Sequence, residues 1–190
     1  LKDYNIKAQL TATPRVGIHK YTFPNGENGH LILDLVHSIY NYDGKVLWST
    51  MRVENDTLVT GYRITNGWAR TNYTYFAISF SQPIVNYGYT DKEKVLYNGF
   101  WRRFQLEKNF PEINGRKIVA YLNFNTAKDS ELTVKVALSP VSMDGALKNL
   151  RAEASGRDFN QIAEAVRTDW NDELKRFEIQ GTNDQKTMFY

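Results

Sequence analysis

Apolar and polar residues alternate with a period of two along much of the first 140 residues, and this pattern restricts the fold more than any other feature. The clearest segments are residues 6–12, 58–64, 74–80, 118–124 and 132–138. Successive side chains of a β-strand point to opposite faces, so this period is typical of strands with one buried face. Turn-forming pairs such as Asp43-Gly44 and Asn114-Gly115 lie between the segments. Many short strands with short turns predict an antiparallel β-sandwich rather than a parallel α/β sheet.

Two places in this part of the chain lead to more specific expectations. The Asp43-Gly44 turn is expected to close a hairpin between residues 39–42 and residues 45–53. Residues 31–36 are almost continuously apolar, which predicts a strand with both faces covered. Asp34 interrupts this run, and its carboxylate should either accept hydrogen bonds from neighbouring groups or lie at a functional surface.

After residue 140 the spacing of apolar residues changes to three and four, which is typical of helices. Ser142 is a candidate N-cap for a first helix, and Asp158 with Gln161 has the capping-box spacing of a second. The apolar stripe of the second helix comprises Phe159, Ile162, Ala163, Val166, Trp170, Leu174 and Phe177. We expect part of this stripe to pack on a domain outside this chain. The predicted fold is thus mostly β, an antiparallel sandwich over residues 1–140 followed by two α-helices over residues 141–190.

Composition and charge exclude several classes of function. The chain has no cysteine, which removes disulfides, thiol nucleophiles and thiolate metal sites. Its net charge is +3 and no basic run exceeds two residues, as at Arg102-Arg103, so we expect no nucleic-acid partner. No apolar run reaches the roughly 18 residues of a membrane-spanning helix. The three histidines, His19, His30 and His37, are scattered without matched acids, so no metal site is expected among them.

The segment Asn66-Gly67-Trp68 lies between two aromatic-rich strands and is the most suggestive place for a binding site. A Trp beside a Gly on a loop can present its ring to solvent, where the C–H face of a sugar can pack on it. The alternative is a core Trp that closes the end of the sandwich. Trp48 and Trp101 lie in apolar or aromatic surroundings and are expected to be core residues. No serine-hydrolase, zinc-protease or nucleotide-binding motif occurs in the sequence.

Several stretches, in order along nearly the whole chain, resemble the signature of glycoside hydrolase family 92, the bacterial exo-acting α-mannosidases. The stretches are residues 10–24, 31–35, 61–80, 134–150, 152–153 and 158–174. The most specific of them reads Val-Lys-Val-Ala-Leu-Ser-Pro-Val-Ser-Met-Asp-Gly-Ala-Leu-Lys-Asn-Leu. Members of this family have an N-terminal β-supersandwich, a helical linker and a large (α/α)6-barrel catalytic domain.

The resemblance implies that residues 1–140 are part of the sandwich and that residues 141–190 are the linker toward a barrel outside this chain. The carboxylates of the inverting mechanism and the calcium ion of the family belong to the barrel. The resemblance therefore assigns no catalytic or metal-binding residue to this chain. Trp68 matches the family position that reaches into the active-site pocket and contacts sugar, and Asn66 and Gly67 lie beside it.

The implied function is that of a fragment of an exo-α-mannosidase that hydrolyses α-linked mannose, with α-1,2 linkages the first expectation, from glycans such as N-glycans. The expected partners are a mannose-containing glycan and the missing catalytic domain, and the expected location is the periplasm or surface of a bacterium. A second hypothesis is a non-catalytic carbohydrate-binding β-sandwich module. A third is a structural interaction domain in which Trp68 is buried.

Overall fold

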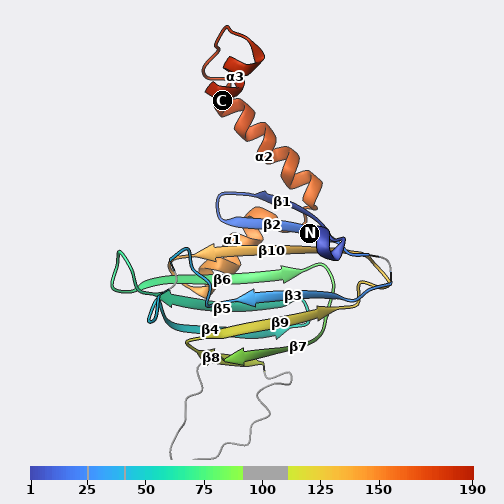
Figure 1. Cartoon of the computed structure of the whole chain (residues 1–190), viewed down its shortest axis with the longest axis vertical. Coiled ribbons are helices and arrows are strands. Elements are labelled where there is room, and N and C mark those ends of the chain that lie inside the picture. The colour runs from blue at the N-terminus through green and yellow to red at the C-terminus, as the bar shows by residue number, and fades with distance from the viewer. Residues whose placement is uncertain (25, 41, 92–110) are drawn as a thin grey trace, which may run out of the picture.

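The computed structural model describes residues 1–190 except residues 25, 41 and 92–110 (Figure 1). The strands are β1 (Lys7–Ala12), β2 (Val16–Thr22), β3 (Gly29–Asp34), β4 (Val46–Asn55), β5 (Leu58–Thr65), β6 (Asn72–Phe80), β7 (Ile84–Asp91), β8 (Glu112–Gly115), β9 (Ile118–Phe124) and β10 (Glu131–Ser139). A 3-10 turn, η1 (Lys2–Tyr4), precedes them, and the helices α1 (Met143–Ala154), α2 (Phe159–Leu174) and α3 (Asn183–Phe189) follow.

The strands form two antiparallel sheets, which confirms the predicted fold class. The larger sheet has seven strands in the order β1-β2-β10-β6-β5-β4-β8, and the smaller has three in the order β3-β9-β7. Every strand pairing among the described residues is antiparallel. All five alternating segments of the sequence are strands.

The main core lies between the two sheets. Met51 and Val59 of the larger sheet are completely buried there, together with Leu122 and Phe124 of the smaller sheet. The rings of Phe80 and Phe124 meet across this layer, with 5.1 Å between their centroids. The face of the larger sheet that lines this core is called its inner face below.

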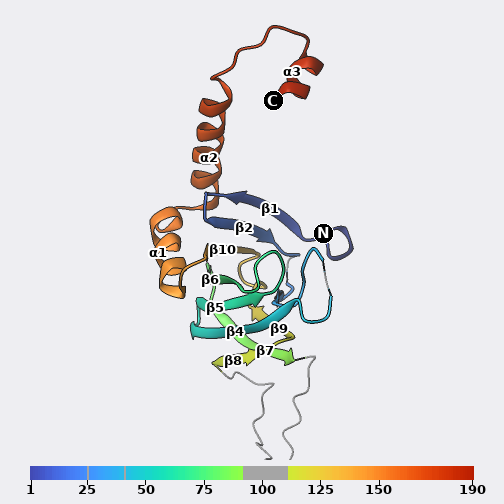
Figure 2. The ribbon, with the colours of Figure 1, turned by 90° about the vertical axis from the view of Figure 1, so that its left-hand side faces the viewer.

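Helix α1 covers the outer face of the larger sheet, so the molecule has a third layer (Figure 2). Ala77 and Ala137 of the sheet face Ala146 of the helix, and all three are fully buried. Small side chains at the contact let the helix backbone approach the strands closely. The helix packs mainly on β10 and β6.

The helix boundaries follow the predicted caps. The Ser142 hydroxyl accepts the backbone N–H of Gly145 at 2.9 Å, and Asp158 and Gln161 form a complete capping box at the start of α2. Between the helices, Nζ of Lys135 donates to the backbone carbonyls of Ala154 at 2.6 Å and Arg157 at 2.7 Å. An ammonium group at the C-terminal end of a helix is favourable, because the last carbonyls have no partner within the helix.

Helix α2 starts against the sandwich and then projects away from it (Figure 1). Phe159 and Ile162 are buried, whereas Trp170 and Phe177 are exposed at 64% and 68%. Only the first turns of the apolar stripe are therefore covered. That another domain covers the remainder stays a prediction.

The predicted hairpin around Asp43-Gly44 is wrong. The turn itself is present, since Gly44 has a φ of 80° and the backbone N–H of Lys45 donates to Tyr42 at 3.1 Å. Ile39, Tyr40 and Tyr42 nevertheless belong to no strand. Instead, β4 pairs with β5 along one edge and with β8 at Ser49–Arg52 along the other.

The expectation that both faces of residues 31–36 are covered is also wrong. Ile32 is 73% exposed, because β3 lies at the edge of the smaller sheet and its outer face has no cover among the described residues. The structural alternative for Asp34 is confirmed. Its carboxylate accepts the backbone N–H groups of Val36 at 2.7 Å and His37 at 3.0 Å, which closes the turn after the strand.

Trp48 is not a core residue. It is 40% exposed, because it lies on the outer face of β4, whereas α1 packs mainly on β10 and β6. Trp101 lies outside the described residues. Among the described helices, none is long and apolar enough to cross a membrane.

Candidate functional site

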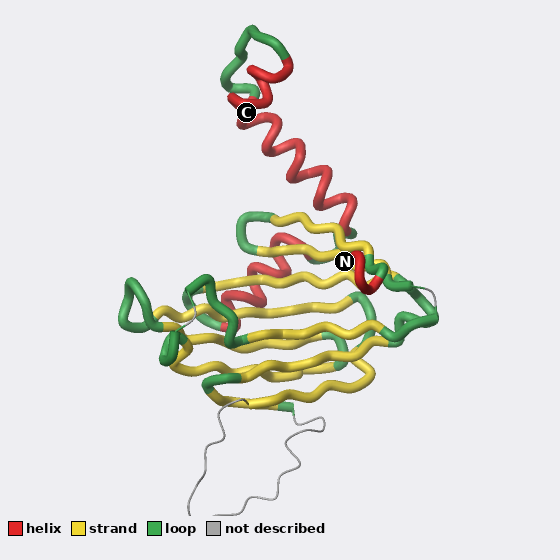
Figure 3. Tube along the Cα trace, viewed as in Figure 1, coloured by secondary structure: helices red, strands yellow, loops and turns green. Residues whose placement is uncertain are grey.

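Four chain connections meet at one end of the sandwich, where Figure 3 shows loops gathered beside the strand ends. They are residues 13–15, 35–45, 66–71 and 140–142. The register explains the clustering. Ala137 pairs with Val16, Ser139 pairs with Tyr75, and Thr65 pairs with Asn72, so the strands on either side of three of these loops end side by side.

Loop 66–71 carries the predicted site residues and is anchored through the backbone of Asn66. The Asn66 N–H donates to the carbonyl of Lys45 at 2.9 Å, and the Tyr42 hydroxyl donates to the Asn66 carbonyl at 3.2 Å. Past this anchor, the Gly67 N–H donates to the carbonyl of Ala69 at 3.1 Å and tightens the tip of the loop. Asn66 is half-buried and Gly67 is exposed. Asn66 thus has a clear role in holding the loop.

Trp68 stands at the tip of this loop with its side chain fully exposed, at 109% of its reference area. The interpretation of Trp68 as a core residue is therefore wrong, and so is the hypothesis of a structural domain in which it is buried. An indole held in water on an anchored loop is typical of a surface that receives a ligand. Contact with a sugar stays a prediction.

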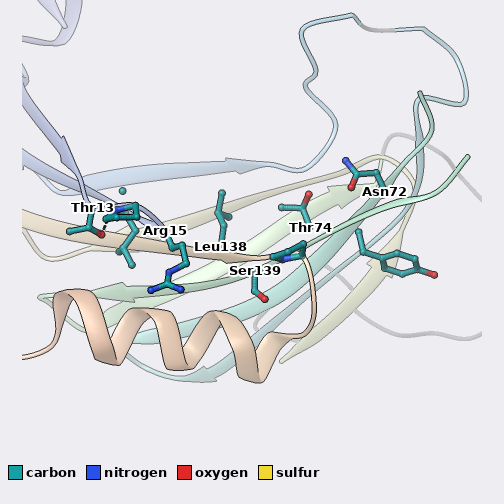
Figure 4. Close-up of a pocket in the computed structure, with 11 residues that line it drawn as sticks. Thr13, Arg15, Asn72, Thr74, Leu138 and Ser139 are labelled. Carbon is teal, nitrogen blue, oxygen red and sulfur yellow. Dashed lines mark hydrogen bonds between the residues drawn. The ribbon is translucent and has the colours of Figure 1, made fainter. Parts of the chain in front are cut away.

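A pocket of about 430 Å³ opens at the same end, between the β1–β2 turn, the start of β6 and the end of β10 (Figure 4). Its lining consists of Thr13, Pro14, Arg15, Val16, Gly17, Asn72, Tyr73, Thr74, Leu138, Ser139 and Pro140. Asn72 begins β6 directly after the Trp68 loop, so the loop and the pocket are neighbours along the chain. The sequence interpretation missed this pocket, and the only available signal was the Thr-Pro-Arg turn in residues 10–24.

The carboxylate of Glu153, on α1, holds the turn that lines this pocket. It accepts the Thr13 hydroxyl at 2.5 Å, the Arg15 backbone N–H at 3.0 Å and the Arg15 Nε–H at 2.5 Å. Burial alone would raise the pKa of Glu153, but the hydrogen bonds from Thr13 and Arg15 outweigh this and lower it. An ionised carboxylate whose oxygens are already engaged is suited to positioning the turn rather than to donating a proton.

Replacing Glu153 with Gln is expected to lower the free energy of unfolding by about 1–3 kcal/mol at pH 7, because charge-assisted hydrogen bonds become neutral or are lost. The folded-state pKa of Glu153 lies below the ordinary value of a Glu carboxyl, about 4.5. The stabilisation is therefore present above that value and is lost as the pH falls through the lower folded-state pKa. Urea unfolding at pH 7 and at acidic pH would measure both effects. Glu164→Gln, at an exposed position of α2, is the matched control. Equal losses in the two variants would contradict the role of Glu153.

Two further titratable groups, His19 and Glu54, have structural partners. His19 Nδ1 lies 2.9 Å from the Tyr21 hydroxyl, and burial lowers the pKa of His19. Glu54 accepts the Thr60 hydroxyl at 2.6 Å and pairs with Arg52 at 3.3 Å. Within the described residues, no three His, Asp or Glu side chains come together as a metal site would require.

Comparisons with known proteins identify the family. The model of the glycosyl hydrolase family 92 N-terminal domain matches residues 1–139, and that of the family 92 catalytic domain matches residues 145–190. The solved family GH92 α-mannosidase BT3965 from Bacteroides thetaiotaomicron, in complex with mannoimidazole, is 31% identical with a TM-score of 0.81. That match covers 96% of this chain and 23% of the BT3965 chain.

Two further solved structures are similar. The family GH92 inverting mannosidase BT2199 from Bacteroides thetaiotaomicron VPI-5482 is 26% identical over 94% of this chain and 22% of its own, with a TM-score of 0.75. A bacterial glucoamylase complexed with acarbose, 15% identical with a TM-score of 0.55 over 90% of this chain and 25% of its own, shares the fold alone. The comparison with curated proteins found no match. The chain spans about a quarter of the length of these solved relatives. The family model matches residues 1–139, and a solved family member overlays 96% of the chain. This chain therefore belongs to glycosyl hydrolase family 92.

Proposed function

We propose that this chain is the N-terminal sandwich and first helices of an exo-acting α-mannosidase that removes α-linked mannose from glycans with inversion. The observation that carries the proposal is the pair of matches within one chain, to the N-terminal domain over residues 1–139 and to the catalytic domain over residues 145–190. A solved relative described as an inverting mannosidase supports the stereochemistry.

In this proposal the sandwich forms one wall of the mannose pocket and the interface with the rest of the catalytic domain. The exposed Trp68 indole packs on the sugar ring, while Asn66 anchors its loop and Gly67 shapes the tip. Family membership and the full exposure of the indole support this role. The substrate is a mannose-containing glycan, with an α-1,2 linkage as the first candidate, and the location is the periplasm or surface of a bacterium.

The reacting groups lie elsewhere in the polypeptide in this proposal. An inverting glycosidase needs a carboxylic acid that protonates the leaving oxygen and a carboxylate that activates water, about 6.5–9.5 Å apart. The carboxylates described above serve structural contacts instead, as with Glu153 against Arg15 and Glu54 against Arg52. Calcium, whose ligands are oxygen atoms, would bind in the remainder of the catalytic domain.

The chain of residues 1–190 is accordingly expected to hydrolyse no α-mannoside. The purified chain would be incubated with an aryl α-mannoside and with α-linked mannobiose, and released mannose would be measured. Turnover that disappears after an acid-to-amide substitution within residues 1–190 would contradict the division of roles.

The function is tested by a polypeptide that joins this chain to the rest of a family 92 catalytic domain. It should release mannose from α-mannosides, and NMR of the first product should show the β-anomer. Absence of mannosidase activity in the folded polypeptide, or α-mannose as the first product, would contradict the proposal. The non-catalytic carbohydrate-binding module remains the second candidate, because the chain presents an exposed Trp68 by itself. That candidate predicts sugar binding without turnover even in the longer polypeptide.

A further inference from the structure

The outer face of the three-stranded sheet forms a second surface, separate from the Trp68 loop. Leu31, Leu33, Leu122 and Phe124 point inward to the core, so the alternate residues of β3 and β9 point outward. In register, His30 pairs with Asn123 and Asn123 with Asn86, which makes one outward row. Ile32 pairs with Tyr121 and makes part of the next row.

This surface has an unusual composition for an exposed sheet. The strands β3, β7 and β9 contain only two charged residues, Asp34 and Asp91, in a chain of which 24% is charged. The Asp34 carboxylate is already engaged by two backbone N–H groups. Ile32 and Tyr121 are exposed at 73% and 40%. Edge strands are usually protected by charged side chains, and β3 and β7 are the two edges of this sheet, so an uncharged face with apolar groups favours an uncharged ligand.

The polar row is connected into a chain of hydrogen bonds. His30 Nδ1 contacts Asn123 Oδ1, and Asn123 Nδ2 donates to Asn86 Oδ1. With Asn123 Oδ1 as the acceptor of an Nδ1–H of His30, Nε2 of the neutral ring would be an acceptor. The second side-chain N–H of Asn123 and both side-chain N–H groups of Asn86 take no part in these two hydrogen bonds, so they are available as donors to a ligand. The row thus holds an acceptor at one end and donors along the rest, in side chains that fix one another.

An aromatic ring lies beside this row. Tyr121 is two residues before Asn123 on β9, so the two side chains project from the same face about 7 Å apart along the strand. A sugar has an apolar C–H face and hydroxyl groups that both donate and accept. It can therefore pack on Tyr121 while its hydroxyls bind the polar row.

We propose that this face, formed by His30, Asn86, Tyr121 and Asn123, is a second binding site for an uncharged glycan. It lies away from the Trp68 loop, because His30 is near the start of β3, whereas loop 35–45, which contacts loop 66–71, follows the end of that strand at Asp34. The site would hold a glycan chain on the protein without taking part in hydrolysis. The inference does not depend on the mannosidase activity proposed above.

The test is a titration of the isotope-labelled 190-residue chain with a linear α-linked mannopentaose, followed by NMR. We expect saturable shifts of the side-chain amide signals of Asn86 and Asn123. Tyr121→Ala should weaken binding at this face at least about tenfold, as for an aromatic at the centre of a contact. Tyr4→Ala removes a tyrosine that is 70% exposed at another place and should leave the binding unchanged.

A second variant keeps the test decisive if Tyr121→Ala does not fold. Asn86→Ala removes the donors at the Asn86 end of the row and should also weaken binding. Absence of shifts at Asn86 and Asn123, or shifts confined to residues 66–71, would overturn the inference. The same holds if the signals of this face move with protein concentration alone, since that result would identify the face as a contact between two copies of the chain. Because the readout is binding to this chain, its failure is separate from failure to hydrolyse mannosides.

Discussion

Replacing Trp68 with Ala in a polypeptide that contains the complete catalytic domain is expected to lower kcat/KM for α-mannosides about ten- to thousand-fold. The indole is fully exposed on a loop whose base is anchored at Asn66, so it is available to a sugar held by the facing domain. Loss of an aromatic contact and of substrate positioning corresponds to roughly 1.5–4 kcal/mol of transition-state binding. Trp68→Phe retains an apolar ring but loses the indole N–H. Its kcat/KM should therefore lie between those of the unchanged enzyme and of Trp68→Ala.

Stability separates this expectation from a packing effect. Because Trp68 has no cover in this structure, its removal should leave the melting temperature of residues 1–190 nearly unchanged. Thermal unfolding and steady-state kinetics would be measured on the same preparation of the longer enzyme. Unchanged kcat/KM per folded molecule would rule out the sugar contact, whatever happens to stability.

Gly61→Ala is expected to have the largest effect on stability, at least about 3 kcal/mol. Gly61 lies in β5 between Met51 of β4 and Phe76 of β6. A Cβ at this position would stand 2.1 Å from the backbone oxygen of Thr50 and 2.5 Å from Cζ of Phe76. Both neighbours are held inside the sheet, so neither can move without breaking other contacts. The total free energy of unfolding of a domain is about 5–15 kcal/mol, so such a loss is a large part of it.

Gly17→Ala is the matched control for this change. Gly17 is also in a strand, β2, but the nearest atom to an added Cβ is His19 Nε2 at 3.6 Å. That is an ordinary contact distance, so Gly17→Ala should be close to neutral. Denaturant unfolding of both variants gives the comparison. A loss below about 1 kcal/mol for Gly61→Ala would show that the sheet yields at this point.

Local features of this fold could be predicted from the sequence. The period of two identified β1, β5, β6, β9 and β10 as strands. In β1 the expected buried face is wrong, because this strand lies at the edge of the larger sheet and Leu10 is 67% exposed. The helix caps at Ser142 and Asp158 could also be predicted, because a capping side chain accepts a hydrogen bond from a backbone N–H only three residues away.

Features set by distant parts of the chain could not be predicted. The exposure of Ile32 and Trp48 depends on which layer covers each sheet face, and a run of apolar residues carries no such information. Glu153 meets Arg15 across a separation of 138 residues, and nothing in either segment indicates the other. The Gly-Trp pair was compatible with both a core and an exposed indole, and only the path of loop 66–71 separates the two.

The most direct test of the account is the structure of the longer enzyme with mannoimidazole bound. Trp68 is predicted to lie in the pocket, with its indole within about 4 Å of the inhibitor ring. The loop should retain the backbone hydrogen bond from Asn66 to Lys45. An inhibitor bound in the catalytic domain, with Trp68 left in solvent or packed on protein away from the pocket, would contradict the central claim that the sandwich supplies a wall of the mannose site.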